Sequence, residues 1–184
     1  MGRTFVGFDT ETTGLKAADG DKIIEVALLT YDLDSGKLID QYVQRINPGR
    51  AIDPKAQEVH KIDISMLIGM PDFATVAPEI KKRLEGADFC IAHNLNFDAE
   101  FLAVEFAAAG IPLAPVPSVD TMDARWATFN GKSPNLGELC FSVGVEYDPS
   151  KAHGAEYDVD VMSQCYMKGL KLGFFQLPPE LMPT

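Results

Sequence analysis

The sequence predicts an α/β fold with one mixed central sheet, which combines an antiparallel meander with parallel strands and is flanked by helices. Strand-like segments follow one another near the N-terminus, and helical and strand-like segments then alternate to the end of the chain. The chain has 184 residues and 46% hydrophobic content, which is enough for one domain to bury a core without disulfide or metal staples.

The first third of the chain predicts the antiparallel meander. Its three strands are expected at residues 4–9, 23–31 and 38–46. Gly14 and Gly20 mark a loop after the first strand, and Asp-Ser-Gly at residues 34–36 is a turn signal before the third. The segment 32–36 slightly resembles a calcium-binding loop, but its glycine stands one place too early, so a hairpin tip is favoured.

The remaining elements follow from helical spacing and stop signals. Residues 47–54 are expected to form a connecting loop, Gly86 ends the first helix, and Gly110 with Pro112 ends the second. Helices are predicted at residues 76–84, 98–109, 123–129, 136–143 and 156–172, and strands at residues 89–92 and 116–119.

The composition indicates one domain that is free of disulfides and outside the membrane. Residues 1–174 are expected to form this domain, and residues 175–184 a Pro-rich C-terminal tail. No apolar run approaches the roughly 18 residues of a membrane span, and no signal peptide is visible, so a cytoplasmic location is expected. The odd number of cysteines, all with apolar neighbours, favours reduced, buried thiols at Cys90, Cys140 and Cys165.

Four acidic side chains in three sequence contexts are candidates for chemistry. Asp9 and Glu11 stand two residues apart at a strand end, so their side chains share one side of the strand. Asp98 shares a helical stripe with Leu102 and Phe106, which turns its carboxylate toward the core. Carboxylate oxygens are preferred ligands of Mg²⁺ and Mn²⁺, and a two-metal site for phosphodiester cleavage needs such a set.

The last predicted helix supplies the fourth acid. Asp158 forms a stripe with Met162 and Cys165, whereas Asp160 points to the opposite side of the helix and is the weaker ligand candidate. His153 precedes Asp158 by five residues and is the candidate general base.

Each of these signals has an ordinary alternative. A bare D-x-E such as that of Asp9 and Glu11 is expected by chance about 0.7 times in a chain this long. Asp98 could cap its helix, Asp158 could be a first-turn acid, and His153 could be a surface histidine. Their joint occurrence in one order favours a shared site, and converging carboxylates would repel one another unless cations lay between them.

The net charge of −11 disfavours tight binding to a long polyanion. Residues 81–83, Lys-Lys-Arg, form the single basic cluster of the sequence. Two divalent ions would add four positive charges where a phosphate lies, so catalysis needs little further basic surface. Binding to a long nucleic acid is therefore expected to be weak and distributive.

Three motifs occur in order between residues 4 and 172. They are D-x-E with Asp9 and Glu11, N-x-x-F-D with Asn94, Phe97 and Asp98, and H-x-A-x-x-D with His153, Ala155 and Asp158. This set closely resembles the DEDDh branch of the 3′-to-5′ exonucleases, the group of the proofreading subunit of bacterial replicative polymerases.

The resemblance implies a ribonuclease H-like fold and a two-metal mechanism. Two Mg²⁺ or Mn²⁺ ions would be held by Asp9, Glu11, Asp98 and Asp158. His153 would deprotonate the attacking water. The implied reaction hydrolyses phosphodiester bonds at single-stranded 3′ ends of DNA, or alternatively RNA, and releases nucleoside 5′-monophosphates. Apart from the resemblance, the tail from Phe174 onward could serve a DNA polymerase or a second copy of the chain, or it could be an apolar helix end that packs on its own domain.

The resemblance also implies six contacts with the terminal nucleotide, at Thr12, Gly14, Leu15, His60, Asn94 and Phe97. Gly14 lets backbone amides approach closely, Leu15 can wedge against a base, and Phe97 offers a packing surface. Alternatively, Phe97 belongs to the core and Thr12 only caps the turn.

Two further positions bear on the resemblance. His60 lies in Val-His-Lys-Ile, where Lys61 replaces the glycine of the family segment, which is a departure from the family pattern beside this contact. Asp120 matches a family position, but at a strand end before a helix it is expected to cap or brace that helix.

Three competing functions remain open at this stage. An exonuclease that trims oligonucleotides or RNA would share the same site. A non-catalytic module could keep the fold and dock a polymerase through its acidic surface or tail, although the intact acids argue against it. A phosphoesterase for small nucleotides would explain the scarcity of basic surface.

Overall fold

The computed structural model describes residues 2–182, which form one five-stranded sheet in the order β3-β2-β1-β4-β5. Its strands are β1 (Thr4–Thr12), β2 (Ile23–Asp32), β3 (Leu38–Arg45), β4 (Phe89–Ala92) and β5 (Ser118–Asp120). β1, β2 and β3 are antiparallel neighbours, whereas β4 runs parallel to β1 and β5 parallel to β4. The prediction of a meander joined to parallel strands is confirmed.

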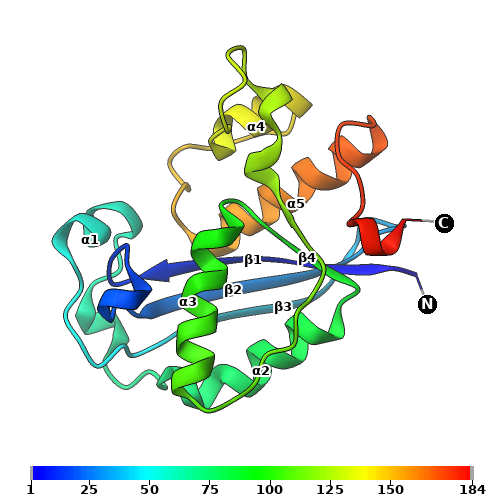
Figure 1. Ribbon diagram of the computed structural model, residues 1–184. Coiled ribbons are helices and arrows are strands. Elements are labelled where there is room, and N and C mark those ends of the chain that lie inside the picture. Colours follow the sequence, from blue (N-terminus) through cyan, green and yellow to red (C-terminus); the bar gives the residue numbers. More distant parts are fainter. Residues whose placement is uncertain (1, 183–184) are drawn as a thin grey trace.

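Helices cover both faces of the sheet, with α2 and α3 on one side and α4 and α5 on the other (Figure 1). The helices are α1 (Pro54–His60), α2 (Phe73–Gly86), α3 (Leu95–Ala108), α4 (Leu136–Val143) and α5 (Ala155–Lys171). Short 3₁₀ turns occur at Ala17–Asp19, Ile64–Leu67, Thr121–Asp123, Arg125–Ala127 and Pro179–Leu181.

The alternation of side chains along β1 creates two cores. Phe5 faces α5 and packs with Tyr166, whereas the next residue, Val6, faces the core that contains Phe106 of α3. Asp9 and Glu11 have the same parity as Phe5, so both carboxylates emerge on the α5 side of the sheet.

A glycine on β1 lets α5 cross the strand closely. A β-carbon on Gly7 would lie 2.5 Å from Ser163 Oγ and 2.9 Å from Val159 Cγ1, which is too short for side chains to tolerate. Gly7 therefore allows α5 to pack directly on β1. This contact brings the first turn of α5, with Asp158, toward the acids at the end of β1.

A helix stands where the sequence predicts only the end of a loop. α1 begins at Pro54, and the Asp53 side chain caps it by accepting a hydrogen bond from Lys55 N at 2.7 Å. Proline is well suited to the first helical turn because its missing N–H has no partner there. The helix has only seven residues, which is too short for hydrophobic periodicity to reveal it.

The helix predicted at residues 123–129 is wrong. The segment forms two 3₁₀ turns, which are separated by Ala124 with a non-helical ψ of 54°. The Asp120 side chain caps the first turn by accepting from Met122 N at 2.9 Å. The chain therefore turns twice in short steps before α4, whose predicted bounds are confirmed.

The second predicted helix starts earlier than expected. α3 begins at Leu95 with Asn94 at the N-cap, so the alternative that Asp98 caps this helix is wrong. Asp98 lies in the first turn and is only 2% exposed, together with the buried Leu102 and Phe106 of the predicted stripe.

The cysteine prediction is confirmed, since Cys90, Cys140 and Cys165 are buried and free. Phe175 packs on Tyr166 with ring centroids 5.2 Å apart, so the start of the Pro-rich segment lies against the core. The division of the chain at residue 174 stays a prediction. Within residues 2–182, no helix combines the length and the apolar character needed to cross a membrane.

Candidate active site

One cavity of about 660 Å³ receives side chains from β1, α3, α5 and the loop before α5. It is lined by Asp9, Thr10, Glu11, His93, Asn94, Phe97, Asp98, Met122, Asn135, Leu136, Gly137, Tyr147, His153, Asp158, Val159 and Met162. The four predicted acids and the predicted base are all among them. Asp160, the weaker candidate, is not among them, and its carboxylate accepts hydrogen bonds from Tyr31 and Gln164, each at 2.8 Å.

Asp98 is held against β1 by the residue between the other two acids. Its Oδ1 accepts a hydrogen bond from Thr10 N at 3.0 Å and another from Thr10 Oγ1 at 2.6 Å. Thr10 points to the α3 side of the sheet because side chains alternate along a strand. The motif D-x-E therefore supplies two acids on one face and an anchor for a third acid on the other.

Asn94 makes a sharp turn between β4 and α3. It has φ +82°, in the left-handed region that Asn tolerates better than most residues. The Asp120 carboxylate accepts from the backbone N–H groups of Asn94 and Leu95 at 3.1 and 3.0 Å. Asp120 thus braces the start of α3, as the sequence predicts, and positions the first turn that carries Asp98.

The loop before α5 places His153 at the mouth of the cavity. His153 is exposed and has φ +63°, a conformation that non-glycine residues rarely adopt outside functional or tightly constrained sites. Its backbone N–H donates to Asp158 Oδ2 at 2.9 Å. The other oxygen, Asp158 Oδ1, is buried and has no hydrogen-bond partner among the described residues.

The clustered carboxylates disfavour one another's charge. The pKa of Asp9 is well above its ordinary value, first because of burial and then because of the negative charges of Asp98, Glu11 and Asp158. Burial and the facing Glu25 raise the pKa of Glu11 to about 8, and burial raises that of Asp98 to about 7. Such a site favours protons or metal cations.

The comparison with known proteins bears directly on this constellation. A protein-family model described as Exonuclease matches residues 6–166. The chain belongs to this exonuclease family. The match covers most of the chain and includes all three motifs, so the resemblance to the DEDDh 3′-to-5′ exonucleases is confirmed.

Relatives of this chain include proteins of bacteria. It is 33% identical over 165 residues to the DNA polymerase III subunit epsilon of Treponema pallidum, which covers 88% of this chain and 74% of that protein. It is 30% identical over 168 residues to the 3′-5′ exonuclease DinG of Bacillus subtilis, which covers 91% of this chain. The chain spans only 18% of the length of DinG.

Solved structures share the fold. The nuclease domain of 3′hExo, a DEDDh family member bound to rAMP, superposes with a TM-score of 0.75 at 14% identity and covers 95% of both chains. Exonuclease X in complex with 5′ overhanging duplex DNA superposes with a TM-score of 0.70 at 22% identity. The match covers 94% of this chain and 95% of that one. The zinc-bound complex of Escherichia coli ExoI with single-stranded DNA superposes with a TM-score of 0.79 at 21% identity. The match covers 94% of this chain and 41% of that one.

The carboxylate oxygens in this cavity are suitable ligands for hard divalent cations, but they are not already arranged as a metal site. Within residues 2–182, no three His, Cys, Asp or Glu side chains are grouped as a metal-ligand set. Bare carboxylates repel one another, so cations would favour a closer approach of these groups. Asp158 Oδ1 has no hydrogen-bond partner among the described residues, and the pKa values of Asp9 and Glu11 are raised. Cations between these groups would coordinate the free oxygen and stabilise the negative charges.

The predicted nucleotide contacts divide into two groups. Asn94 and Phe97 line the cavity, and Phe97 is half-buried with its ring centroid 4.9 Å from that of Phe101. The other four, Thr12, Gly14, Leu15 and His60, lie outside the lining of the cavity. Burial lowers the pKa of His60, whose Nδ1 accepts from Ile62 N at 3.0 Å.

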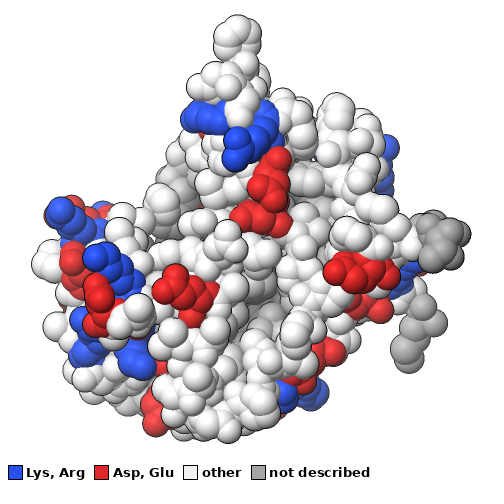
Figure 2. Space-filling model, in the orientation of Figure 1, with Lys and Arg blue, Asp and Glu red and all other residues white. Residues whose placement is uncertain are grey.

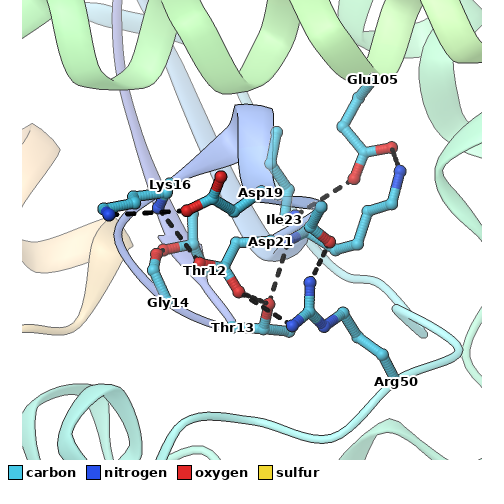
Figure 3. Close-up of polar contacts among 11 residues, drawn as sticks. Thr12, Thr13, Gly14, Lys16, Asp19, Asp21, Ile23, Arg50 and Glu105 are labelled. Atoms are coloured by element: carbon cyan, nitrogen blue, oxygen red, sulfur yellow. Dashed lines mark hydrogen bonds and ion pairs between the residues drawn. The ribbon is translucent and has the colours of Figure 1, made fainter.

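The loop after β1 is fixed by its own polar contacts (Figure 3). Thr12 Oγ1 donates to the Gly14 carbonyl at 2.6 Å, which supports a turn-capping role for this threonine. The Asp21 carboxylate accepts from Thr13 Oγ1 and Lys16 N, both at 3.1 Å. A β-carbon on Gly14 would lie 2.4 Å from Asp21, so glycine is required here for packing, and the loop presents Leu15 with 79% exposure.

Sequence reasoning missed several residues of the cavity. His93 directly precedes the N-x-x-F-D motif, and its position beside Asn94 is a signal that could have identified it. Its Nδ1 lies 2.9 Å from Thr121 Oγ1. Tyr147 and Gly137 come from segments that carry no motif, so only the fold reveals them.

Proposed function

We propose that this chain is a metal-dependent 3′-to-5′ exonuclease that removes nucleotides one at a time from single-stranded 3′ ends and releases nucleoside 5′-monophosphates. DNA is the first candidate substrate, and RNA is the alternative. The observation that carries this proposal is the convergence of four carboxylates and His153 on one cavity. The family and its relatives support the reaction class.

The four carboxylates would hold two Mg²⁺ or Mn²⁺ ions. The proposed ligands are Asp9, Glu11, Asp98 and Asp158. When bound, such ions supply positive charge that orients the phosphate and stabilises the attacking and leaving oxygens. Thr10 would keep Asp98 in a fixed orientation, as partners of metal ligands commonly do.

His153 is the proposed general base. It lies at the edge of the cavity on a loop that its own backbone N–H ties to Asp158, so its imidazole is free to take a proton from the attacking water. The exposure of His153 lets the proton pass to solvent after each turnover.

The remaining predicted residues would hold the terminal nucleotide. Phe97 offers its ring to the base or sugar, and Asn94 presents an amide at the cavity wall. The rigid loop after β1 would bring Leu15 against the terminal base, with Thr12 and Gly14 maintaining the shape of the loop. His60 would complete this second wall from the end of α1.

The biological setting of the proposal is proofreading or end trimming in the cytoplasm. The epsilon subunit relative suggests a DNA polymerase as a partner, and a second copy of this chain is the alternative. The cavity is lined by residues of this chain, so the isolated chain is the material for the first assay.

The test is hydrolysis of a 5′-labelled single-stranded 20-mer with Mn²⁺ and with Mg²⁺. The proposal predicts a ladder of products shortened from the 3′ end and release of nucleoside 5′-monophosphate, both abolished by EDTA. Asp9→Asn and Asp158→Asn should lower the rate at least about 1,000-fold, since removing one ligand breaks the cation site. Asp160→Asn, two residues further on the same helix, is the matched control and should retain activity.

His153→Ala separates base catalysis from metal binding. It should lower kcat by roughly 100- to 10,000-fold while calorimetry shows unchanged Mn²⁺ affinity. Full activity of Asp158→Asn, or equal losses in Asp158→Asn and Asp160→Asn, would contradict the assignment.

A specific observation favours short substrates as a second candidate. The net charge is −11, and the basic side chains on the face in Figure 2 form separate groups rather than a continuous track. An oligonucleotide-trimming enzyme needs no such track. Comparing kcat/KM for a dinucleotide, a 5-mer and a 20-mer decides between the two, since a trimming enzyme should prefer the short ones.

A further inference from the structure

Two aromatic rings are almost fully exposed, one in the segment before α4 and one on α4 itself. Phe129 is 110% exposed and Phe141 is 90% exposed, whereas the buried side of α4 is formed by Leu139, Cys140 and Val143. The fold therefore gains little from either ring. Grouped apolar exposure of this kind usually marks a binding surface.

A nearby aromatic residue shows what a structural role looks like in this region. Trp126 packs against Phe174 and Phe175, with ring centroids 4.8 and 5.5 Å apart. Phe129 and Phe141 make no such aromatic pair among the described residues. Among residues 2–182, Phe129 and Phe141 are the most exposed aromatic side chains, since Phe174 is 50% and Trp126 42% exposed.

The two rings border a hollow of about 500 Å³ that adjoins the cavity of the four acids at one shared residue. Gly137 lines both the cavity and the hollow. Phe129, Lys132 and Phe141 are among the residues that line the hollow but not the cavity. Phe141 stands four residues after Gly137 on α4, so the two occupy one stripe of the helix. A strand that leaves the cavity across Gly137 would meet the rings next.

Basic side chains accompany the rings. Lys132 lines the hollow and pairs with Glu138 at 2.8 Å, and Arg125 is exposed without an ion pair among the described residues. Figure 2 shows Lys and Arg side chains gathered just below the projecting tip at the top, which is the yellow-green segment before α4 in Figure 1. Acidic side chains lie directly beneath this group in Figure 2, and Glu138 lines the hollow beside Lys132. Arg125 and Lys132 therefore supply the positive charge that a phosphate backbone would meet here.

We infer that this aromatic hollow, formed by Phe129, Lys132 and Phe141, binds the single-stranded nucleic acid on the 5′ side of the terminal nucleotide. The rings stack on its bases and Lys132 faces its phosphates. The inference rests on the proposed function and extends it, since it assigns the path of the remaining strand. Stacking on exposed rings is tolerant of sequence, which suits an enzyme that removes any nucleotide.

Two substrates separate the hollow from the reaction. The p-nitrophenyl ester of thymidine 5′-monophosphate fills only the terminal position, whereas a single-stranded 12-mer reaches the hollow. The ratio of kcat/KM for the 12-mer to that for the ester should fall roughly 5- to 150-fold in Phe129→Ala and in Phe141→Ala. Ile39→Ala, an exposed apolar residue on β3, is the control and should leave the ratio unchanged.

Conservative variants distinguish stacking from apolar contact. Phe129→Tyr and Phe141→Tyr keep the aromatic face and should leave the ratio of kcat/KM unchanged. Phe129→Leu and Phe141→Leu keep only apolar surface and should lower the ratio. Glu138→Gln should raise the ratio, because it frees Lys132 while Gln still completes the capping box with Asn135.

Binding measured without metal isolates the inference from catalysis. By fluorescence anisotropy the labelled 12-mer should bind wild-type protein and lose affinity in both Ala variants, even if hydrolysis were absent and the proposed function failed. Unchanged affinity and an unchanged ratio in both Ala variants would overturn the inference. So would loss of self-association in those variants, seen by sedimentation with binding unaffected, since it would assign the rings to a protein interface.

Discussion

Thr10 is a positioning residue that lies between two acids and holds a third. Its backbone N–H and Oγ1 both donate to Asp98 Oδ1. Thr10→Val keeps the shape and the backbone bond but removes the 2.6 Å hydroxyl bond. Metal ligands that lose such a partner commonly lose 10- to 100-fold in metal affinity, so we expect Mn²⁺ binding, measured by calorimetry, to weaken by about that factor.

A matched control for this change lies on the neighbouring strand. Thr30→Val on β2 removes a threonine hydroxyl that makes no side-chain hydrogen bond to a described residue. It should leave Mn²⁺ affinity unchanged. Equal weakening by both variants would show that the bond to Asp98 has no special role.

The acids of the cavity should make the metal-free protein sensitive to pH. The folded-state pKa of Glu11 is about 8, above its ordinary 4.5, so the folded state holds this proton more tightly than the unfolded state. Its contribution to stability is full below about pH 4.5 and is lost as the pH rises toward 8. The Tm of Glu11→Gln should therefore fall less than that of wild type when the pH is raised from 5 to 8 in EDTA.

The same melting experiment with Mn²⁺ provides the converse. Cations between the carboxylates should raise the Tm of wild type at pH 8 more than that of Glu11→Gln. Identical pH dependence of the two proteins in EDTA would mean that Glu11 is not repelled by its neighbours.

The sequence predicts which residues meet at the site, but not their supports. Alternation placed Asp9 and Glu11 together, and helical stripes turned Asp98 and Asp158 inward, because both periodicities are local. The anchoring of Asp98 by Thr10 joins residues 88 positions apart, and no local pattern encodes it. Tyr147 is likewise brought to the cavity only by tertiary packing.

At the scale of elements, α1 ends with a residue in an unfavourable conformation. Lys61 has φ +59° at the C-cap, in the left-handed region that glycine adopts with least cost. Lys61→Gly should therefore stabilise the protein by about 1 kcal/mol, which corresponds to a rise in Tm of roughly 2–4 °C for a chain of this size. Calorimetry measures it directly.

The control is the same substitution inside α1. Lys55→Gly places glycine in the first turn, where it should cost up to about 1 kcal/mol and lower the Tm. If Lys61→Gly also lowered the Tm, the lysine side chain would have to contribute more than the strain of its backbone.

Element prediction succeeded where a strong local signal exists and failed where tertiary contacts decide. The strand at residues 89–92 and the helix at 136–143 are bounded by clear breakers and caps, and both have the predicted bounds. The segment 123–129 has helical composition, yet Ala124 turns out of helical geometry so that the chain can enter α4. Propensity is a weak guide to such short connections.

At the scale of the whole molecule, the charge of −11 opposes a long polyanion outside the cavity. We expect distributive digestion: with excess unlabelled trap added after binding, each encounter with a labelled 40-mer should remove only a few nucleotides. Raising KCl from about 50 to 200 mM should screen this repulsion, so the affinity for the 40-mer should not show the steep loss with salt that is typical of proteins with a basic track.

A 5-mer provides the comparison for this experiment. It has few phosphates outside the cavity, so its kcat/KM should depend less on salt than that of the 40-mer. Digestion of the 40-mer to completion in a single encounter at about 150 mM KCl would contradict the expectation.

The central claim is that Asp9, Glu11, Asp98 and Asp158 hold two cations in one cavity. The most direct measurement is anomalous diffraction from crystals grown with Mn²⁺ and a nucleoside 5′-monophosphate. We predict two manganese peaks about 3.5–4 Å apart, within coordination distance of these carboxylates, with His153 beside the phosphate. No peak in this cavity at saturating Mn²⁺, or manganese bound only elsewhere on the protein, would contradict the claim.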